Sequence, residues 1–307
     1  MALRFLKDQL NINFMKRRVQ AGFISAALIF LSFVAYFVMG GLNFGIDFRG
    51  GTLVQVQFDR AYDIADLRAT LLDADLGSFA LQSFGDESTH EYLVTLSQDD
   101  SENGATDENS ARKVESALHI KYPSAEVRRV ESVGPQVGEE LKLSALYAVL
   151  LSIGAILLYV WLRFQWRFSV GAVVALLHDV LIVVAAFVLT QKEITLPVVA
   201  AILTVAGYSI NDTIVIFDRI RENMRRYQRK DLLELINESI SQTISRTLLT
   251  SGTTLFVVLS IFIFGGGIIH DFAFALLVGI VVGTYSSIYI ATPVVYFLRQ
   301  LFPPKLH

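Results

Sequence analysis

Two oppositely charged residues lie at the facing ends of consecutive apolar runs, where they could form a pair controlled by a proton. Asp212 lies about five residues before the end of the run 196–217, and Arg246 directly precedes the run 247–264. If both runs cross a membrane, Asp212 lies roughly 8 Å inside it, a depth that Arg246 could share on a neighbouring helix. A carboxylate that faces an arginine stays ionised, whereas one that loses its arginine in apolar surroundings takes up a proton more readily. The pair could therefore be a proton-loaded switch or a fixed salt bridge, or Arg246 could extend to the lipid headgroups.

A second ionisable pair, His178 and Asp179, lies in the middle of the apolar run 168–190. Asp179 is about eleven residues into this run, which places it roughly 16 Å deep. Histidine titrates near neutral pH, so the pair could relay protons. Adjacent helical residues point in different directions, however, and a buried, hydrogen-bonded structural pair explains the sequence equally well.

Other kinds of chemistry have no support in the sequence. The chain has no cysteine, which excludes disulfides, thiol nucleophiles and cysteine-ligated metals. Neither a P-loop, nor an HExxH motif, nor a GxSxG motif is present, and the 5 histidines are scattered. We therefore expect no enzymatic activity, no bound cofactor or metal, and no nucleic-acid partner.

The composition indicates a polytopic α-helical membrane protein. Of the 307 residues, 53% are hydrophobic and 18% are charged, and the mean hydropathy is +0.50. Soluble domains have about 25% charged residues. Six apolar runs are long enough to cross a bilayer: 19–40, 141–162, 168–190, 196–217, 247–264 and 272–298. The first exceeds the apolar part of a signal peptide and is predicted to be an anchor. Gly279 and Gly283 in the last run have the GxxxG spacing of closely packed helices.

Charge predicts the orientation of these runs. Residues 41–140 contain 19 acidic and 8 basic residues, a net charge of −11, so the rest of the chain has +8. Arginine and lysine gather in the N-terminal tail, in the loops after the second and fourth runs, and at the C-terminus, whereas the opposite short loops hold only Lys192. The positive-inside rule then places both termini in the cytoplasm and the acidic domain outside.

The acidic domain has the order of strands and helices of a ferredoxin-like α+β domain. Alternating apolar patterns predict strands at 52–58, 79–84, 91–96 and 125–133, and helical spacing predicts helices at 64–72 and 109–122. The predicted divisions are a cytoplasmic tail (1–18), the first span (19–40), the outer domain (41–138), spans two to four (139–217), a cytoplasmic basic segment (218–245), spans five and six (246–298) and a cytoplasmic tail (299–307). We expect the basic segment to lie along the cytoplasmic membrane surface.

Several ordered motifs resemble one family over nearly the whole length. They are GIDFRGG at 45–51, ESVGPQVG at 131–138, LLHD at 176–179, GYSINDTIVIFDRIRE at 207–222, SRTL at 245–248 and GTYSSIY at 283–289. Together they resemble the SecD/SecF family of bacterial protein-export membrane proteins, and the short outer domain favours the SecF branch. The six spans would then resemble half of a resistance-nodulation-division transporter, with SecD supplying the other half.

The resemblance implies a function and partners. Such a subunit, in the bacterial inner membrane, uses the proton as coupling ion to assist late translocation of unfolded preproteins. Its partners would be SecD, the SecYEG channel with its motor SecA, YajC, YidC and the lipid bilayer. The family motifs place Asp212 and Arg246 in proton transport and include Asp179 beside His178. The alternatives are half of a small-molecule transporter and a scaffold of the channel that conducts no protons.

Two glycine-rich motifs flank the outer domain at the membrane boundary. They are predicted to form tight turns, and the junction could act as a hinge; its residues are Gly45, Asp47, Arg49, Gly50 and Gly51 after the first span, and Gly134, Pro135 and Gly138 before the second. Asp47 and Arg49 are expected to pair locally. An engineered cross-link at this junction that leaves export unchanged would contradict the hinge.

Overall fold

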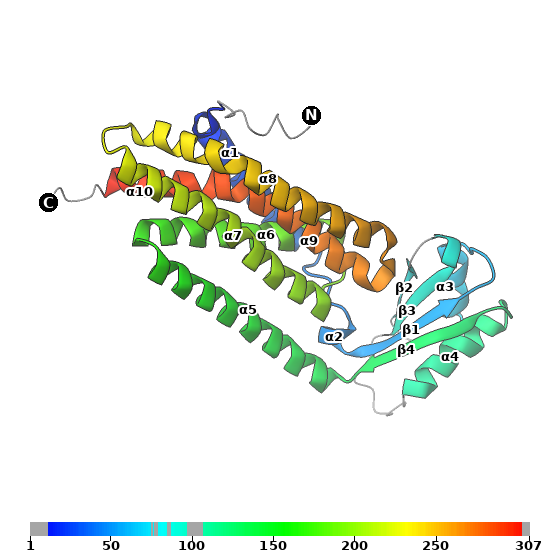
Figure 1. The fold of residues 1–307 in the computed structure, drawn as a ribbon. Helices are drawn as coiled ribbons and strands as arrows, with labels where there is room; N and C mark the ends of the chain where they lie inside the picture. The colour runs from blue at the N-terminus through cyan, green and yellow to red at the C-terminus, as the bar shows by residue number, and fades with distance from the viewer. Residues whose placement is uncertain (1–11, 75, 77–78, 85–86, 97–106, 303–307) are drawn as a thin grey trace.

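The protein consists of a bundle of long helices with a small α+β domain at one end (Figure 1). The computed structural model describes residues 12–74, 76, 79–84, 87–96 and 107–302. Most of the predicted tail 1–18 and part of the predicted tail 299–307 therefore lie outside the described residues.

Six helical spans are long and apolar enough to cross a membrane, which confirms the six predicted runs. The first comprises a 3-10 turn, η2 (Phe14–Arg17), and α1 (Arg18–Val38). The next four are α5 (Pro135–Arg163), α6 (Trp166–Thr190), α7 (Leu196–Arg226) and α8 (Leu232–Phe264). The sixth joins α9 (Gly266–Ser286) through a π-helical segment, η4 (Ser287–Ala291), to α10 (Thr292–Leu301).

Helices α7 and α8 are longer than the runs predicted for them. With 31 and 33 residues they extend for roughly 46 and 50 Å, well beyond the 30 Å of a hydrocarbon core. The segment 218–245 thus consists of the ends of both helices and the turn 227–231, and it forms no separate helix on the membrane surface. Asp231 begins α8 by accepting hydrogen bonds from the backbone of Leu233 and Glu234.

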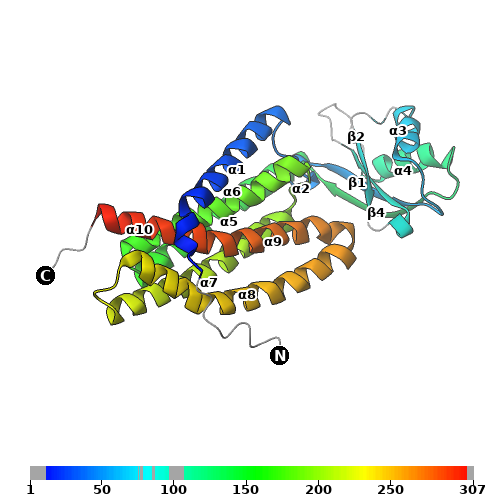
Figure 2. The same ribbon diagram turned by 90° about the horizontal axis from the view of Figure 1, so that it is seen from above.

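The helices α6, α7 and α9 form the centre of the bundle. About half of the most apolar part of each is buried. Helices α1 and α5 are mostly exposed and border the bundle, α5 at its lower edge in Figure 1 and α1 at its upper edge in Figure 2. Helix α9 packs against both α7 and α8. Gly279 and Gly283 make the close approach possible, because a Cβ on them would lie 2.1 Å from Val205 and 2.9 Å from Ser209 of α7. The predicted close packing is confirmed.

The α+β domain has one four-stranded antiparallel sheet with the strand order β2-β3-β1-β4. In chain order its elements are β1 (Gly51–Gln57), α3 (Ile64–Leu72), β2 (Phe79–Phe84), a 3-10 turn η3 (Glu87–Thr89), β3 (Glu91–Leu96), α4 (Asp107–His119) and β4 (Glu126–Val133). The predicted order of strands and helices is confirmed, and the ferredoxin-like classification stays a prediction. The two helices cover one face of the sheet, where Val54, Val94 and Leu118 are buried.

Candidate functional site

Asp212 lies inside the bundle, where α7 faces α8 and α9. Its side chain is 3% exposed. Ser251 of α8 donates a hydrogen bond to Asp212 Oδ2 at 3.2 Å, and Thr284 of α9 donates in turn to Ser251 at 2.9 Å. No other side-chain donor to Asp212 occurs in the described part of the chain. The carboxylate therefore has one hydroxyl partner and unused hydrogen-bonding capacity.

Arg246 does not form the ion pair with Asp212 that its depth suggests. Its side chain is exposed, and among the described residues no ion pair joins it to Asp212. The buried face of α8 contains Thr243, Thr247 and Ser251, which are spaced by four residues. Arg246 directly precedes Thr247, so it points about 100° away from that face. The guanidinium remains within electrostatic range of Asp212.

Asp179 lies at the junction of α6, α7 and α9, and it has a full set of donors. The residue is 0% exposed. His178 Nδ1 lies 2.9 Å from Oδ1, while Ser286 of α9 donates to Oδ2 at 2.7 Å and Ser209 of α7 donates to the same oxygen. Of the two predicted roles, the geometry favours a buried, hydrogen-bonded pair that ties three helices together.

Sequence reasoning missed Ser209 and did not assign Ser251 or Ser286 to particular acids. Ser209 precedes Asp212 by three residues on α7 and therefore lies on the same side of the helix. This spacing could have placed Ser209 on the buried face of α7, but no local pattern indicates that it donates to Asp179 of α6.

The two glycine motifs meet at the end of the bundle that is next to the α+β domain. The short helix α2 (Ile46–Arg49) lies against the start of α5. A Cβ on Gly50 would lie 2.9 Å from Pro135, and one on Gly138 would lie 3.1 Å from the nitrogen of Gly50. Gly50 also has φ +74°, which favours glycine. Gly51 follows as the first residue of β1, and Gly134 directly precedes α5. The joint is closely packed here, and the hinge stays a prediction.

Asp47 caps a helix and makes no local pair. Its Oδ2 accepts a hydrogen bond from the backbone of Leu196 at 2.8 Å, at the start of α7. No ion pair between Asp47 and Arg49 occurs among the described residues. Gly45 N donates to Ile194 O at 2.9 Å, so the predicted junction motif also holds the α6–α7 loop.

Glu193 in this loop was not predicted as a site residue. Burial raises the pKa of the Glu193 carboxyl; Asp271 and Asp47 act in the same direction, and Arg49 opposes them. Gln82 of β2 donates to Glu193 Oε1 at 3.5 Å, a weak contact from the sheet to the bundle. Glu193 thus lies between the two parts of the molecule.

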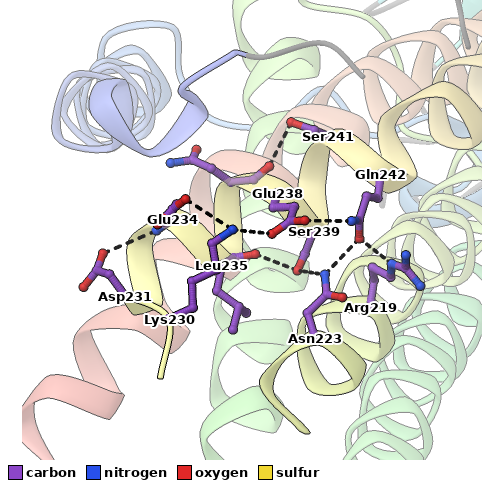
Figure 3. A network of polar contacts seen from close by, with 11 residues as sticks. Arg219, Asn223, Lys230, Asp231, Glu234, Leu235, Glu238, Ser239, Ser241 and Gln242 are labelled. Carbon is purple, nitrogen blue, oxygen red and sulfur yellow. Dashed lines mark hydrogen bonds and ion pairs between the residues drawn. The ribbon is translucent and has the colours of Figure 1, made fainter. Parts of the chain in front are cut away.

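A polar network fixes the opposite end of α7 and α8 (Figure 3). Asn223 of α7 donates to Ser239 at 2.8 Å and to Gln242 at 2.9 Å, and both belong to α8. Arg219 also donates to Gln242. These bonds hold the hairpin together where it extends beyond the apolar spans. In the described ranges no three His, Cys, Asp or Glu side chains gather as metal ligands.

Known proteins resemble this chain over nearly its whole length. The family model "Protein export membrane protein SecD/SecF, C-terminal" matches residues 113–301, and the model "SecD/SecF GG Motif" matches residues 37–61. The protein translocase subunit SecF of Magnetococcus marinus is 47% identical over 95% of this chain and 93% of its own length. The corresponding subunit of Vibrio alginolyticus is 43% identical over 99% of this chain and 96% of its own.

Solved structures agree with these relatives. The crystal structure of SecDF, a translocon-associated membrane protein from Thermus thermophilus, has a TM-score of 0.84 and 38% identity over 94% of this chain. A structure of SecDF in a super-membrane-facing form has a TM-score of 0.67 and 39% identity over the same share. This chain spans 39% of the length of each SecDF chain.

Proposed function

This chain belongs to the SecD/SecF family of protein-export membrane proteins, and on that premise we propose that it couples proton movement to the late translocation of unfolded preproteins. A role in Sec-dependent translocation and a multi-pass place in the inner membrane follow from the family. The use of the proton gradient is the proposed part.

The observation that carries this proposal is the incomplete hydrogen bonding of Asp212. A buried carboxylate with one hydroxyl donor can change between its ionised and protonated forms without breaking a larger network. Approach of a cation favours the ionised form, and its withdrawal favours the protonated one. Arg246 is the nearby cation, and its exposed position leaves it free to move with α8 or with a partner. One proton that crosses 100 mV releases about 2.3 kcal/mol, enough to bias a conformational change.

The proposed partner is SecD, which would supply the second half of the transporter-like assembly. The chain spans 39% of SecDF, a share that supports an assembly with the missing portion. We further propose contact with SecYEG and its motor SecA, with YajC and YidC, and with the preprotein. The basic inner ends of the spans support a cytoplasmic position for both termini and an outward position for the α+β domain.

The test replaces the acid and its cation in cells or vesicles that depend on this subunit. We expect Asp212→Asn and Arg246→Met to reduce export to the level that the wild type shows with an uncoupler. Asp218→Asn is the matched control, since Asp218 lies on the same helix but is exposed and paired with Arg163 at 3.1 Å. Export that keeps its full gradient dependence in Asp212→Asn would contradict the proposal and favour a scaffold.

A further inference from the structure

A cleft of 630 Å³ lies beside α1, on a side of the bundle that the proposed proton site does not use. It is lined by Lys16, Arg17, Gln20, Ile24, Tyr285 and Tyr289. The N-terminal end of α1 meets the sixth span at the π-helical segment η4 between α9 and α10 (Figure 2). Volumes of 300–1,000 Å³ are typical of sites that hold a small molecule.

One end of the cleft is positively charged. Lys16 and Arg17 are exposed at the start of the first span, and none of the described residues that line the cleft is acidic. Within the described residues neither side chain takes part in an ion pair. Two cations at the polar end of an apolar helix lie at the level of lipid headgroups.

The other end of the cleft is apolar and aromatic. Ile24 is 56% exposed and lies about 12 Å along α1 from Lys16. Tyr285 and Tyr289 form the facing wall, with ring centroids 5.3 Å apart. Tyr285 is held in place because its hydroxyl donates to Ala21 O at 2.8 Å. This bond bridges the two helices.

We propose that this cleft binds one anionic phospholipid. The phosphate lies between Lys16 and Arg17, and the upper acyl carbons follow Ile24 and the tyrosine rings. Two observations select a lipid as occupant. The cleft changes from charged to apolar along the first span, and α1 is exposed over most of its surface. The two cations, with no acid among the described lining residues, select a negative headgroup.

The test measures which lipid lies next to the cleft. Trp161 and Trp166 are the 2 tryptophans of the chain, and both are replaced by phenylalanine. A single reporter is then introduced as Tyr289→Trp, with Ile24→Trp as a second reporter in the cleft. Phe23→Trp is the matched control, since Phe23 is 75% exposed on the same helix but does not line the cleft. The full chain is placed in phosphatidylcholine vesicles that contain brominated phosphatidylglycerol, which quenches tryptophan on contact.

We expect the cleft reporters to detect phosphatidylglycerol at about fivefold or more above its bulk fraction, and the Phe23 reporter to detect the bulk fraction. Lys16→Gln combined with Arg17→Gln should abolish the enrichment, whereas Arg225→Gln combined with Arg229→Gln, an equal loss of charge elsewhere, should preserve it. Equal quenching at cleft and control reporters would overturn the proposal. Displacement by inorganic phosphate would also overturn it, because the site would then recognise a free anion.

Discussion

Asp179 and Asp212 are both buried among α6, α7, α8 and α9, yet their carboxylates have different numbers of donors. Asp179 accepts from Ser209 and Ser286 and lies against His178, whereas Asp212 accepts from Ser251 alone within the described residues. A carboxylate with several donors is stabilised as an anion, and its protonation would break bonds between three helices. Protonation of a carboxylate with one donor affects only one hydrogen bond.

This contrast distinguishes an acid that ties helices together from an acid that can change its protonation state, within one bundle. Both acids lie close to α9, whose Gly283 is in contact with α7 and whose hydroxyls reach toward both acids. In our proposal, a proton at Asp212 changes the contact of α7 with α8 while the Asp179 junction keeps α6, α7 and α9 together. The donor count thus predicts which acid governs stability and which governs export.

The largest expected effect is a loss of stability in Asp179→Ala. Removal of this carboxylate leaves the Ser209 hydroxyl and His178 Nδ1 without their acceptor, while Ser286 keeps a bond to Gly283 O at 3.1 Å. Each buried group left unpaired costs about 1–3 kcal/mol, so we expect a loss of about 3 kcal/mol. Thermal unfolding in detergent, followed by loss of helical signal, measures it.

Asp212→Ala is the matched variant for this measurement. Ser251 still accepts from Thr284, and only its own O–H loses an acceptor, so we expect a smaller loss of about 1 kcal/mol. Equal losses of stability in Asp179→Ala and Asp212→Ala would contradict the proposed difference between the two acids.

A smaller effect distinguishes the hydroxyl donors. Ser286→Ala removes one of the hydrogen bonds that the Asp179 carboxyl group accepts, and a bond to a charged group is worth about 1.5–3 kcal/mol. Ser251→Ala removes a bond to an acid that passes through a protonated form in our proposal, and a neutral bond is worth about 1 kcal/mol. Ser286→Ala should therefore lower the unfolding temperature more than Ser251→Ala does. Gradient-dependent export should instead fall more in Ser251→Ala. A reversed order in either assay would contradict the assignment of roles.

The sequence predicted the six spans and both acids because apolar length and the cost of buried charge are local properties. It could not predict the donors, since Ser209 and Ser286 are 30 and 107 residues from Asp179. Depth along a helix follows from residue number, but the direction of a side chain depends on which face packs. For this reason the sequence could place Asp212 and Arg246 at a similar depth but could not decide among a switch, a fixed salt bridge and an arginine that extends to the headgroups. Among the described residues no ion pair joins the two side chains.

The junction between the α+β domain and the bundle likewise contains contacts that the sequence could not predict. Asp47 caps a helix that begins 149 residues later, and no local pattern indicates such a partner. The glycines were predictable as close-approach positions, because Gly50 and Gly138 occur in motifs at the two membrane boundaries. That they would contact one another depends on the order in which the helices pack.

Glu193 extends the comparison to a carboxyl group outside the spans, where titration is directly measurable. Its donor, Gln82, is at 3.5 Å, so hydrogen bonding compensates little of its burial. Because its pKa in the folded protein is raised above the ordinary 4.5, the protonated form is favoured by folding. The stabilisation is complete below pH 4.5 and is lost as the pH rises through the raised value.

We therefore expect the smallest effect, about 1 kcal/mol or less, from Glu193→Gln, which keeps the shape and removes the charge. Hydrogen exchange at the Gly45 amide, which donates to Ile194 O at 2.9 Å, measures the stability of the junction. After correction for intrinsic exchange, wild-type protection should decrease as the pH rises from 4.5 to 8, while the variant stays protected throughout. Glu91→Gln, a change on β3 in the same domain, should leave the wild-type profile intact. If Glu193→Gln kept the wild-type pH dependence, the number of donors would not decide how a carboxyl group of this protein titrates, and the contrast between Asp179 and Asp212 would need another cause.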